Sequence, residues 1–337
     1  MKTFFTVSFT GYAKYGLILL KFLTVFMLTS CSSSSSDSPT TFTPVNTLEG
    51  KVFILGSQID GASGDLLLYV NGTDINGNVL TVTDLKTTTV SVGSTAYTDG
   101  DGSLTIEAVS DSDNFLSLSL VTDYSNSTNG ELEFVDGIYT ELLNNLPEVF
   151  EAQIITFSDE HELQQDWTSS LSDLLLVVDP ATEVGAHSVR NKTALYDSMH
   201  YALEADAGDL TDGLIDRCRP AHIMVVFTDG DDNESSLITS PVDLQTIVNA
   251  DKTVSIMLGT SDAKLDVLQT LAGDHGAVVQ VVDPTTLENE VDKWVSSLQN
   301  IVKMTLAVDV SGESVSITIG SQTEIVVSPL ELLCTPL

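Results

Sequence analysis

The chain has 337 residues, of which 42% are hydrophobic. This is enough for two domains with a sizeable core and argues against a disordered chain. The 48 acidic residues against 13 Lys and Arg give a formal net charge of −35, which excludes nucleic acid as an expected partner because phosphate binding needs a basic surface. A solvated acidic surface is the simplest interpretation, and abundant binding of divalent cations is the alternative.

The N-terminal segment has the pattern of an export signal. Lys2, Lys14 and Lys21 precede an apolar run over residues 22–28. The run is shorter than the roughly 20 residues that span a bilayer, and its length suits the core of a signal peptide. The following Leu28-Thr29-Ser30-Cys31 resembles the lipobox of bacterial lipoproteins. The alternative is an ordinary signal peptide with a cysteine there by chance.

The lipobox resemblance implies that residues 1–30 are removed and that Cys31 becomes a lipidated N-terminus. Ser32 at the next position resembles lipoproteins sorted to the outer membrane. Residues 31–46 are rich in Ser, Thr and Pro, as expected of a flexible tether. We therefore expect an envelope protein that contacts the membrane only through its lipid.

Residues 47–113 contain short strand-like runs separated by turn signals, which predicts a small antiparallel, Ig-like β module. The expected strands cover residues 51–55, 66–70, 79–83 and 88–92. Asp99-Gly100-Asp101-Gly102 partly matches a calcium-binding EF-hand loop. Since the first ligand position of that loop would be Tyr97, a hairpin turn is the favoured interpretation.

Residues 114–302 alternate between buried strands and amphipathic helices. This pattern predicts an α/β domain with a doubly wound, mostly parallel sheet covered on both faces. The expected strands cover residues 116–121, 152–157, 174–178, 223–227, 253–258 and 277–282. Strand-like runs return in residues 303–337. They are too few to fold alone, so they could complete the β module and leave the α/β domain as an insertion.

Three polar motifs each follow a predicted strand or open a predicted helix of the α/β domain. They supply Asp123, Ser125 and Ser127 in a D-x-S-x-S run, then Thr193, then Asp229 in Thr-Asp-Gly. Ligands of open α/β sheets bind beyond the carboxyl ends of the strands, so all three motifs can reach one edge. Carboxylate and hydroxyl oxygens are the ligands that Mg²⁺ prefers.

The order of these motifs resembles the metal-ion-dependent adhesion site of von Willebrand factor type A (VWA) domains, over roughly residues 115–302. The resemblance implies that Ser125 and Ser127 bind the metal directly, Thr193 directly or through water, and Asp123 and Asp229 mainly through water. Mg²⁺ is the expected ion, with Mn²⁺ or Ca²⁺ as alternatives, and a carboxylate from a protein partner would complete the shell. The competing interpretation of the D-x-S-x-S run alone is a helix N-cap cluster.

Other candidate ligands carry less weight. Residues 128–130, Thr-Asn-Gly, stand where integrin-type β domains have the acids of an adjacent calcium site, so no second site is expected. Asp231, Asp232 and Glu234 favour a solvated loop, with direct ligation as the alternative. The histidines lack metal-site spacing, and no nucleophile motif is present in the sequence.

These features favour a non-catalytic module that binds proteins or mediates adhesion at the envelope through its metal. An accessory subunit of an envelope assembly is the second hypothesis. A hydrolase using the metal or a Ser/His pair is the third and least favoured. We expect no enzyme activity.

The last expectation is a disulfide bond between Cys218 and Cys334. Lipidation of Cys31 leaves these two thiols in an oxidising compartment, where pairing is favoured. Cys218 precedes a predicted strand, and the closing helix returns the chain to the same edge. Two unpaired thiols are the alternative.

Overall fold

The structure is a computed structural model. It describes residues 50–74, 76–110, 113, 115–146, 150–178, 191–205, 211–280, 284–308, 315–319 and 322–326. The predicted export signal, the tether, Cys31 and Cys334 lie outside these ranges. No helix in the described ranges has the length and apolar character needed to cross a bilayer.

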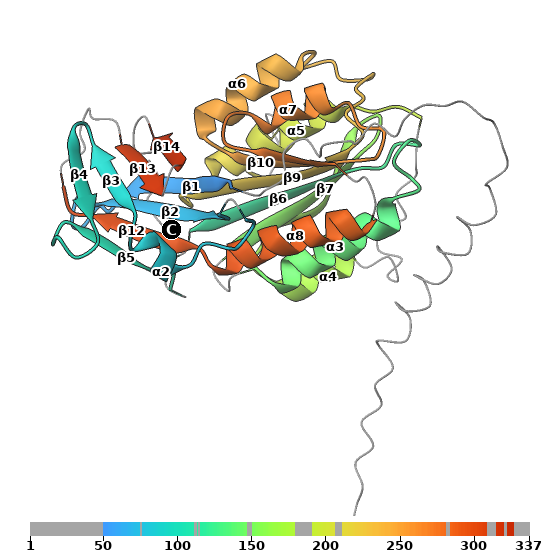
Figure 1. The fold of residues 1–337 in the computed structure, drawn as a ribbon. Helices are drawn as coiled ribbons and strands as arrows, with labels where there is room; N and C mark the ends of the chain where they lie inside the picture. The colour runs from blue at the N-terminus through green and yellow to red at the C-terminus, as the bar shows by residue number, and fades with distance from the viewer. Residues whose placement is uncertain are drawn as a thin grey trace, which may run out of the picture. The chain divides into compact units, whose positions relative to one another are not determined.

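Six of the described strands form the α/β sheet, in the order β11-β10-β9-β6-β7-β8 (Figure 1). They are β6 (Leu116–Asp123), β7 (Phe150–Phe157), β8 (His161–Thr168), β9 (Ala221–Thr228), β10 (Val254–Gly259) and β11 (Ala277–Gln280). All neighbours pair in parallel except β7 and β8. Every residue of β6, β7 and β9 is buried, as expected where helices cover both faces of a parallel sheet.

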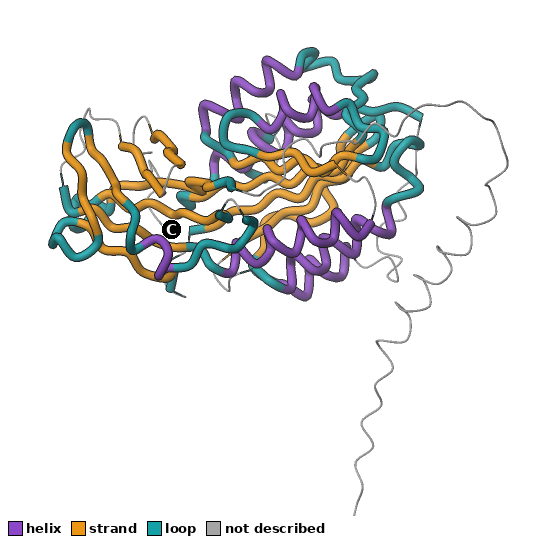
Figure 2. Tube along the Cα trace, viewed as in Figure 1, coloured by secondary structure: helices purple, strands orange, loops and turns teal. Residues whose placement is uncertain are grey.

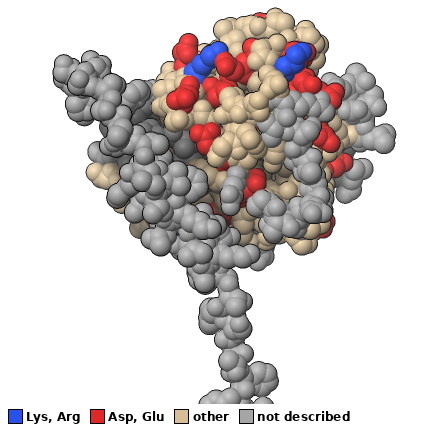
Figure 3. All heavy atoms as spheres, turned by 90° about the vertical axis from the view of Figure 1, so that its right-hand side faces the viewer, with Lys and Arg blue, Asp and Glu red and all other residues tan. Residues whose placement is uncertain are grey.

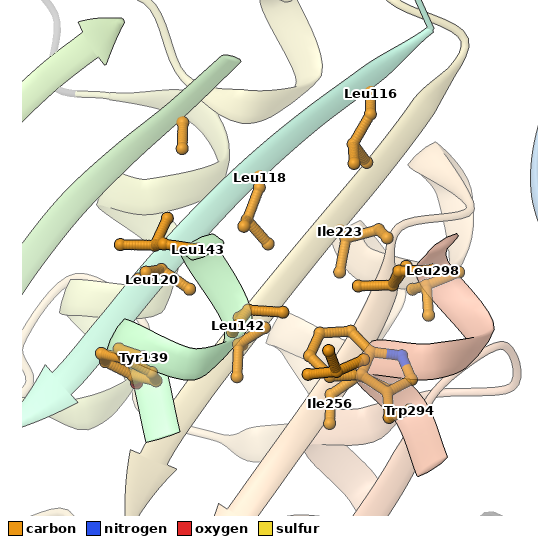
Figure 4. Close-up of a cluster of buried hydrophobic side chains, with 14 of the residues drawn as sticks. Leu116, Leu118, Leu120, Tyr139, Leu142, Leu143, Ile223, Ile256, Trp294 and Leu298 are labelled. Atoms are coloured by element: carbon orange, nitrogen blue, oxygen red, sulfur yellow. The ribbon is translucent and has the colours of Figure 1, made fainter. Parts of the chain in front are cut away.

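Helices cover both faces of this sheet (Figures 1 and 2). One face carries α3 (Leu132–Asn144), α4 (Leu171–Val178) and α8 (Pro284–Gln299), and the other carries α5 (Leu195–Glu204), α6 (Pro241–Asp251) and α7 (Leu265–Ala272). In the first layer Leu142 of α3 and Trp294 of α8 belong to one buried cluster with Leu118 of β6, and Trp294 lies beside Ile256 of β10 (Figure 4). Burial of one such leucine contributes about 1.5–3 kcal/mol. The predicted doubly wound α/β fold is confirmed.

Among the described residues, the β module consists of two antiparallel layers. One has the order β5-β12-β2-β1 and continues through β1 and β9 into the α/β strands as one ten-stranded sheet, and the other is a separate sheet with the order β14-β13-β3-β4. The strands are β1 (Val52–Ile59), β2 (Leu66–Gly72), β3 (Thr89–Val92), β4 (Thr95–Thr98), β5 (Leu104–Ala108), β12 (Val302–Leu306), β13 (Val315–Ile319) and β14 (Gln322–Val326). β12 lies between β2 and β5, and β13 pairs with β3. Strands that follow the α/β region in sequence therefore pair with strands that precede it.

The β module and the α/β sheet meet where β1 pairs with β9 at Gly56 and Ala221. A Cβ atom on Gly56 would lie 1.7 Å from the carbonyl oxygen of Pro220, so the two backbones approach this closely only because residue 56 is glycine. The contact is extended by a hydrogen bond of 3.1 Å from Asn71 to Ser297.

Two predicted strands are wrong. Residues 174–178 belong to helix α4, in which Leu174 and Val178 are buried one turn apart. Residues 79–83 contain one isolated bridge, at Val79, before the short helix α2 (Val82–Leu85). Helix α2 is preferred because Thr81 and Asp84 form a capping box, which satisfies backbone donors at the helix start.

The turn at Asp99–Gly102 also differs from the expected hairpin, because it connects β4 in one sheet to β5 in the other. The carboxylate of Asp101 accepts hydrogen bonds from the backbone amides of Thr98, Ser103 and Leu104 at 2.7–3.2 Å. Asp99 accepts one from Ile106 at 3.2 Å. Both acids therefore act as turn and strand caps.

Replacement of Gly56 by alanine should destabilise the protein by about 3 kcal/mol, because the new methyl group would push β1 away from Pro220. Gly61→Ala is the matched control, since a Cβ there meets nothing within 4 Å. Urea unfolding of both variants measures the effect. Equal stability of the two would show that the junction is not closely packed.

Cys218 takes part in a disulfide bond and lies just before β9, at the edge of the sheet opposite the carboxyl ends. Because Cys334 lies outside the described residues, its pairing with Cys218 stays a prediction. Peptide mapping without reductant should yield a linked 218–334 peptide, absent in Cys218→Ser. A closed loop of about 100 residues would stabilise the fold by roughly 4–5 kcal/mol. Alkylation of Cys334 in the unreduced native protein would disprove the pairing.

Candidate functional site

The five predicted site residues lie around the carboxyl ends of β6 and β9. Asp123 is the last residue of β6, and Ser125 and Ser127 follow it in the adjoining loop. Asp229 directly follows β9, and Thr193 lies just before α5. This edge is the right-hand end of the α/β sheet in Figure 1. Parallel pairing of β6 and β9 brings two of the motifs together, as the sequence predicts.

The carboxyl group of Asp123 is fully buried and fixed by two hydrogen bonds. One oxygen accepts from the backbone amide of Ser125 at 2.8 Å, and the other accepts from the hydroxyl of Thr228 at 2.8 Å. Thr228 in turn accepts from the amide of Gly230 at 3.1 Å. The β9 loop therefore orients the β6 carboxylate.

Hydrogen bonds from Thr128 stabilise the loop after Asp123. The buried hydroxyl of Thr128 lies 2.7 Å from the carbonyl oxygen of Asp123 and 3.1 Å from that of Ser125. The hydroxyls of Ser125 and Ser127 are 3.0 Å apart, with Ser125 buried and Ser127 exposed. Two hydroxyl oxygens of the predicted ligand set therefore point toward each other.

Thr193 is buried and is bound by the loop that follows Asp229. Its amide donates to the side chain of Asn233 at 3.1 Å, and its carbonyl accepts from the amides of Asn233 and Glu234 at 2.9 and 3.1 Å. The side chain of Lys192 forms an ion pair with Glu234 at 2.6 Å. These contacts hold the threonine in place beside the β9 loop.

The three acids that follow Asp229 each have a protein partner. Asp231 pairs with Lys264, and Glu234 pairs with Lys192 as described. Asp232 accepts from the amide of Tyr196 at 3.3 Å and from the hydroxyl of Ser235 at 2.6 Å. These partners support a structural role for the three acids.

Asp123 and Asp229 are held by neutral donors instead, in the case of Asp229 by the amide of Asp231 at 2.8 Å. Burial raises the pKa of Asp123 to about 6, and the nearby negative charge of Asp229 adds to the effect. Asp229 is itself only 8% exposed. Across the described ranges, no Lys or Arg forms an ion pair with either carboxylate. A buried carboxylate is costly unless a cation compensates it.

The chemistry of the donor set fits a hard divalent cation. It offers two carboxylates and three hydroxyls and neither nitrogen nor sulfur, which suits Mg²⁺ better than softer metals. The described part of the chain contains no cluster of three or more His, Cys, Asp or Glu side chains placed to hold a metal. A cation here would therefore depend on the hydroxyls of Ser125, Ser127 and Thr193.

The supporting residues could not be predicted individually. Thr128 is notable in the sequence as a missing acid, and Thr228 as part of Thr-Asp-Gly. Asn233 falls within an acidic loop with no distinguishing pattern. A general signal existed for Thr128 alone, because Ser and Thr side chains near a turn often bond neighbouring backbone groups.

Among solved structures, the chain is similar to proximal thread matrix protein 1 from the mussel byssus, with 15% identity and a TM-score of 0.46. The match covers 60% of this chain and 50% of the mussel protein. Another structure of the mussel protein, 18% identical with a TM-score of 0.43, has a zinc-occupied MIDAS motif; 59% of this chain and 49% of that one are covered.

Two bacterial structures are also similar. BatB from Bacteroides thetaiotaomicron has 15% identity and a TM-score of 0.39, over 54% of this chain and all of that one. A von Willebrand factor type A protein from Catenulispora acidiphila has 11% identity and a TM-score of 0.45, over 79% of this chain and 52% of that one. The chain thus spans about half the length of the mussel protein and of the Catenulispora protein.

No curated protein matches the chain. The family model described as the von Willebrand factor type A domain matches residues 118–293. This range begins within β6 and ends within α8, so it contains the whole candidate site and just over half of the chain. The protein belongs to the von Willebrand factor type A domain family.

Proposed function

We propose that this protein binds other proteins through a divalent cation held by Asp123, Ser125, Ser127, Thr193 and Asp229. VWA domains are protein-interaction modules, and the site lies in the matched range. The observation that carries the proposal is the pair of buried carboxylates, neither of which forms an ion pair with a Lys or Arg of the described residues. Mg²⁺ is the ion we expect, and Mn²⁺ or Ca²⁺ would suit the same oxygen donors.

The arrangement of these residues supports a binding role. When bound, the cation supplies an electrophilic position that accepts a carboxylate from the partner protein. Asp123 is oriented by Ser125 and Thr228 before any ligand arrives, and Thr193 is fixed by Asn233. Because little reorganisation is needed, more of the interaction energy contributes to affinity.

We further propose that the protein is anchored to the bacterial envelope by a lipid on Cys31 and sorted to the outer membrane. The supporting evidence is the Leu28–Cys31 sequence and the Ser-rich run after it. We propose no catalytic role for the site. Hydrolysis of members of an ester and phosphoester panel that is lost in Asp229→Ala would contradict that proposal.

Asp123→Ala and Asp229→Ala should each weaken Mg²⁺ binding by at least 10–100-fold, as loss of metal-site residues does. Asp231→Ala is the matched control, because Asp231 pairs with Lys264 instead. Titration calorimetry measures affinity, and circular dichroism checks that each variant folds. Wild-type affinity in both site variants would show that the ligands are wrongly assigned.

Cys31→Ser should move the protein from the membrane fraction to the soluble fraction, because a lipid is the proposed anchor. Ser32→Ala keeps the cysteine and should stay with membranes. Fractionation and intact-mass measurement distinguish the two. Identical behaviour of Cys31→Ser and wild-type protein would contradict lipid anchoring.

A further inference from the structure

Three large hydrophobic side chains are exposed among the described residues: Leu176 (49%), Leu237 (62%) and Val242 (57%). Leu176 lies on α4, whereas Leu237 and Val242 lie on the other side of the sheet, in the loop after Asp229 and the first turn of α6. Single exposed apolar side chains are normal on a protein surface, so their meaning depends on their surroundings.

Leu237 is held in a fixed position. The carboxylate of Asp197 accepts hydrogen bonds from the amides of Ser236, Leu237 and Ile238 at 2.7, 3.0 and 2.8 Å. The amide of Asp197 donates to Ser235 at 3.0 Å. Because the backbone is already ordered, covering Leu237 costs only the rotamer entropy of its side chain.

The same contacts connect this anchored segment to the candidate metal site. Asp197 lies in the first turn of α5, and Thr193 directly precedes the N-cap of that helix. Asn233, four positions before Leu237, bonds Thr193 directly. Val242 is placed by the cap of α6, where its amide donates to Ser240 at 3.2 Å.

The charge of the surrounding face limits the partners that fit. Figure 3 views the molecule from the right-hand side of Figure 1, and the charged side chains visible there among the described residues are mostly acidic. Lys192 and Lys264 are each neutralised by an acid. A second copy of this chain, with its net charge of −35, would be repelled, whereas basic residues on a partner would be attracted.

We propose that Leu237 and Val242 form the apolar half of the metal-dependent binding site. The partner is then a protein segment that carries an acidic residue for the metal, an aliphatic side chain next to it, and basic residues further out. This inference rests on the proposed metal-dependent function and adds the chemistry of the ligand. The metal would fix the acid, and the apolar contact would select among acidic segments.

A peptide array tests the proposal with the full chain in Mg²⁺. Each peptide contains one glutamate, with leucine or serine at the neighbouring positions and lysine or serine further out. We expect glutamate peptides with a neighbouring leucine to bind roughly tenfold more tightly than those with serine, as burial of one aliphatic side chain allows. Outer lysines should strengthen binding at low salt.

Three variants assign the selectivity. Leu237→Ser and Val242→Thr should remove most of the preference for leucine while Mg²⁺ affinity stays at the wild-type value. Leu176→Ser is the matched control, with a similarly exposed leucine on the opposite face, and should retain the preference. Asp197→Asn weakens the acceptor that holds Leu237 and should reduce the preference in part.

The outcomes separate the two proposals. Mg²⁺-dependent peptide binding with no leucine preference, or with a preference unchanged in Leu237→Ser, overturns the inference and leaves the metal-dependent function standing. Failure to bind both Mg²⁺ and peptides overturns both. Loss of the preference in Leu176→Ser, or Mg²⁺-dependent self-association by sedimentation, would also overturn the inference.

Discussion

Asp123 and Thr228 are 105 positions apart in sequence, and they form a hydrogen bond because β6 and β9 are parallel neighbours. Through this bond the β9 loop orients the carboxylate at the end of β6. Asp229 then follows as the next residue, and its loop reaches across to Thr193. If β6 and β9 paired in another register, the predicted ligands would separate, so the site depends on the same sheet that forms the core.

The α/β sheet ends at a polar edge, where the carboxylates differ in the groups that stabilise their charge. Most acids around that edge bond to lysines, hydroxyls or backbone amides, as Asp197, Asp231 and Asp232 do. Asp123 accepts bonds from an amide and a hydroxyl as well, but burial still raises its pKa, as does the adjacent charge of Asp229. Such a cost is expected where function requires a preformed site. Burial of apolar side chains between the sheet and its two helical layers has to offset this cost.

The sequence predicted the α/β fold because strand-like segments, of which β9 is the most apolar, alternate with amphipathic helices, a pattern that a sheet covered on both faces explains. It predicted α4 wrongly, since five apolar residues in a row do not distinguish a short strand from a helix. It missed β8, a polar strand paired only with β7. The site motifs could be recognised because ligand oxygens recur at fixed spacing, whereas Asn233 and Asp197 act through contacts that only the folded chain creates.

The position of β12 has a mechanical consequence. Helix α8 leads directly into this strand, which is hydrogen-bonded on one side to β2 and on the other to β5. The two chain segments that connect the β module to the α/β domain are also joined, by a hydrogen bond of 3.3 Å from Val109 to Ile301. A force applied to the α/β domain would be transmitted along the axis of β12. Both rows of hydrogen bonds would then be loaded in shear and would have to break together rather than one by one.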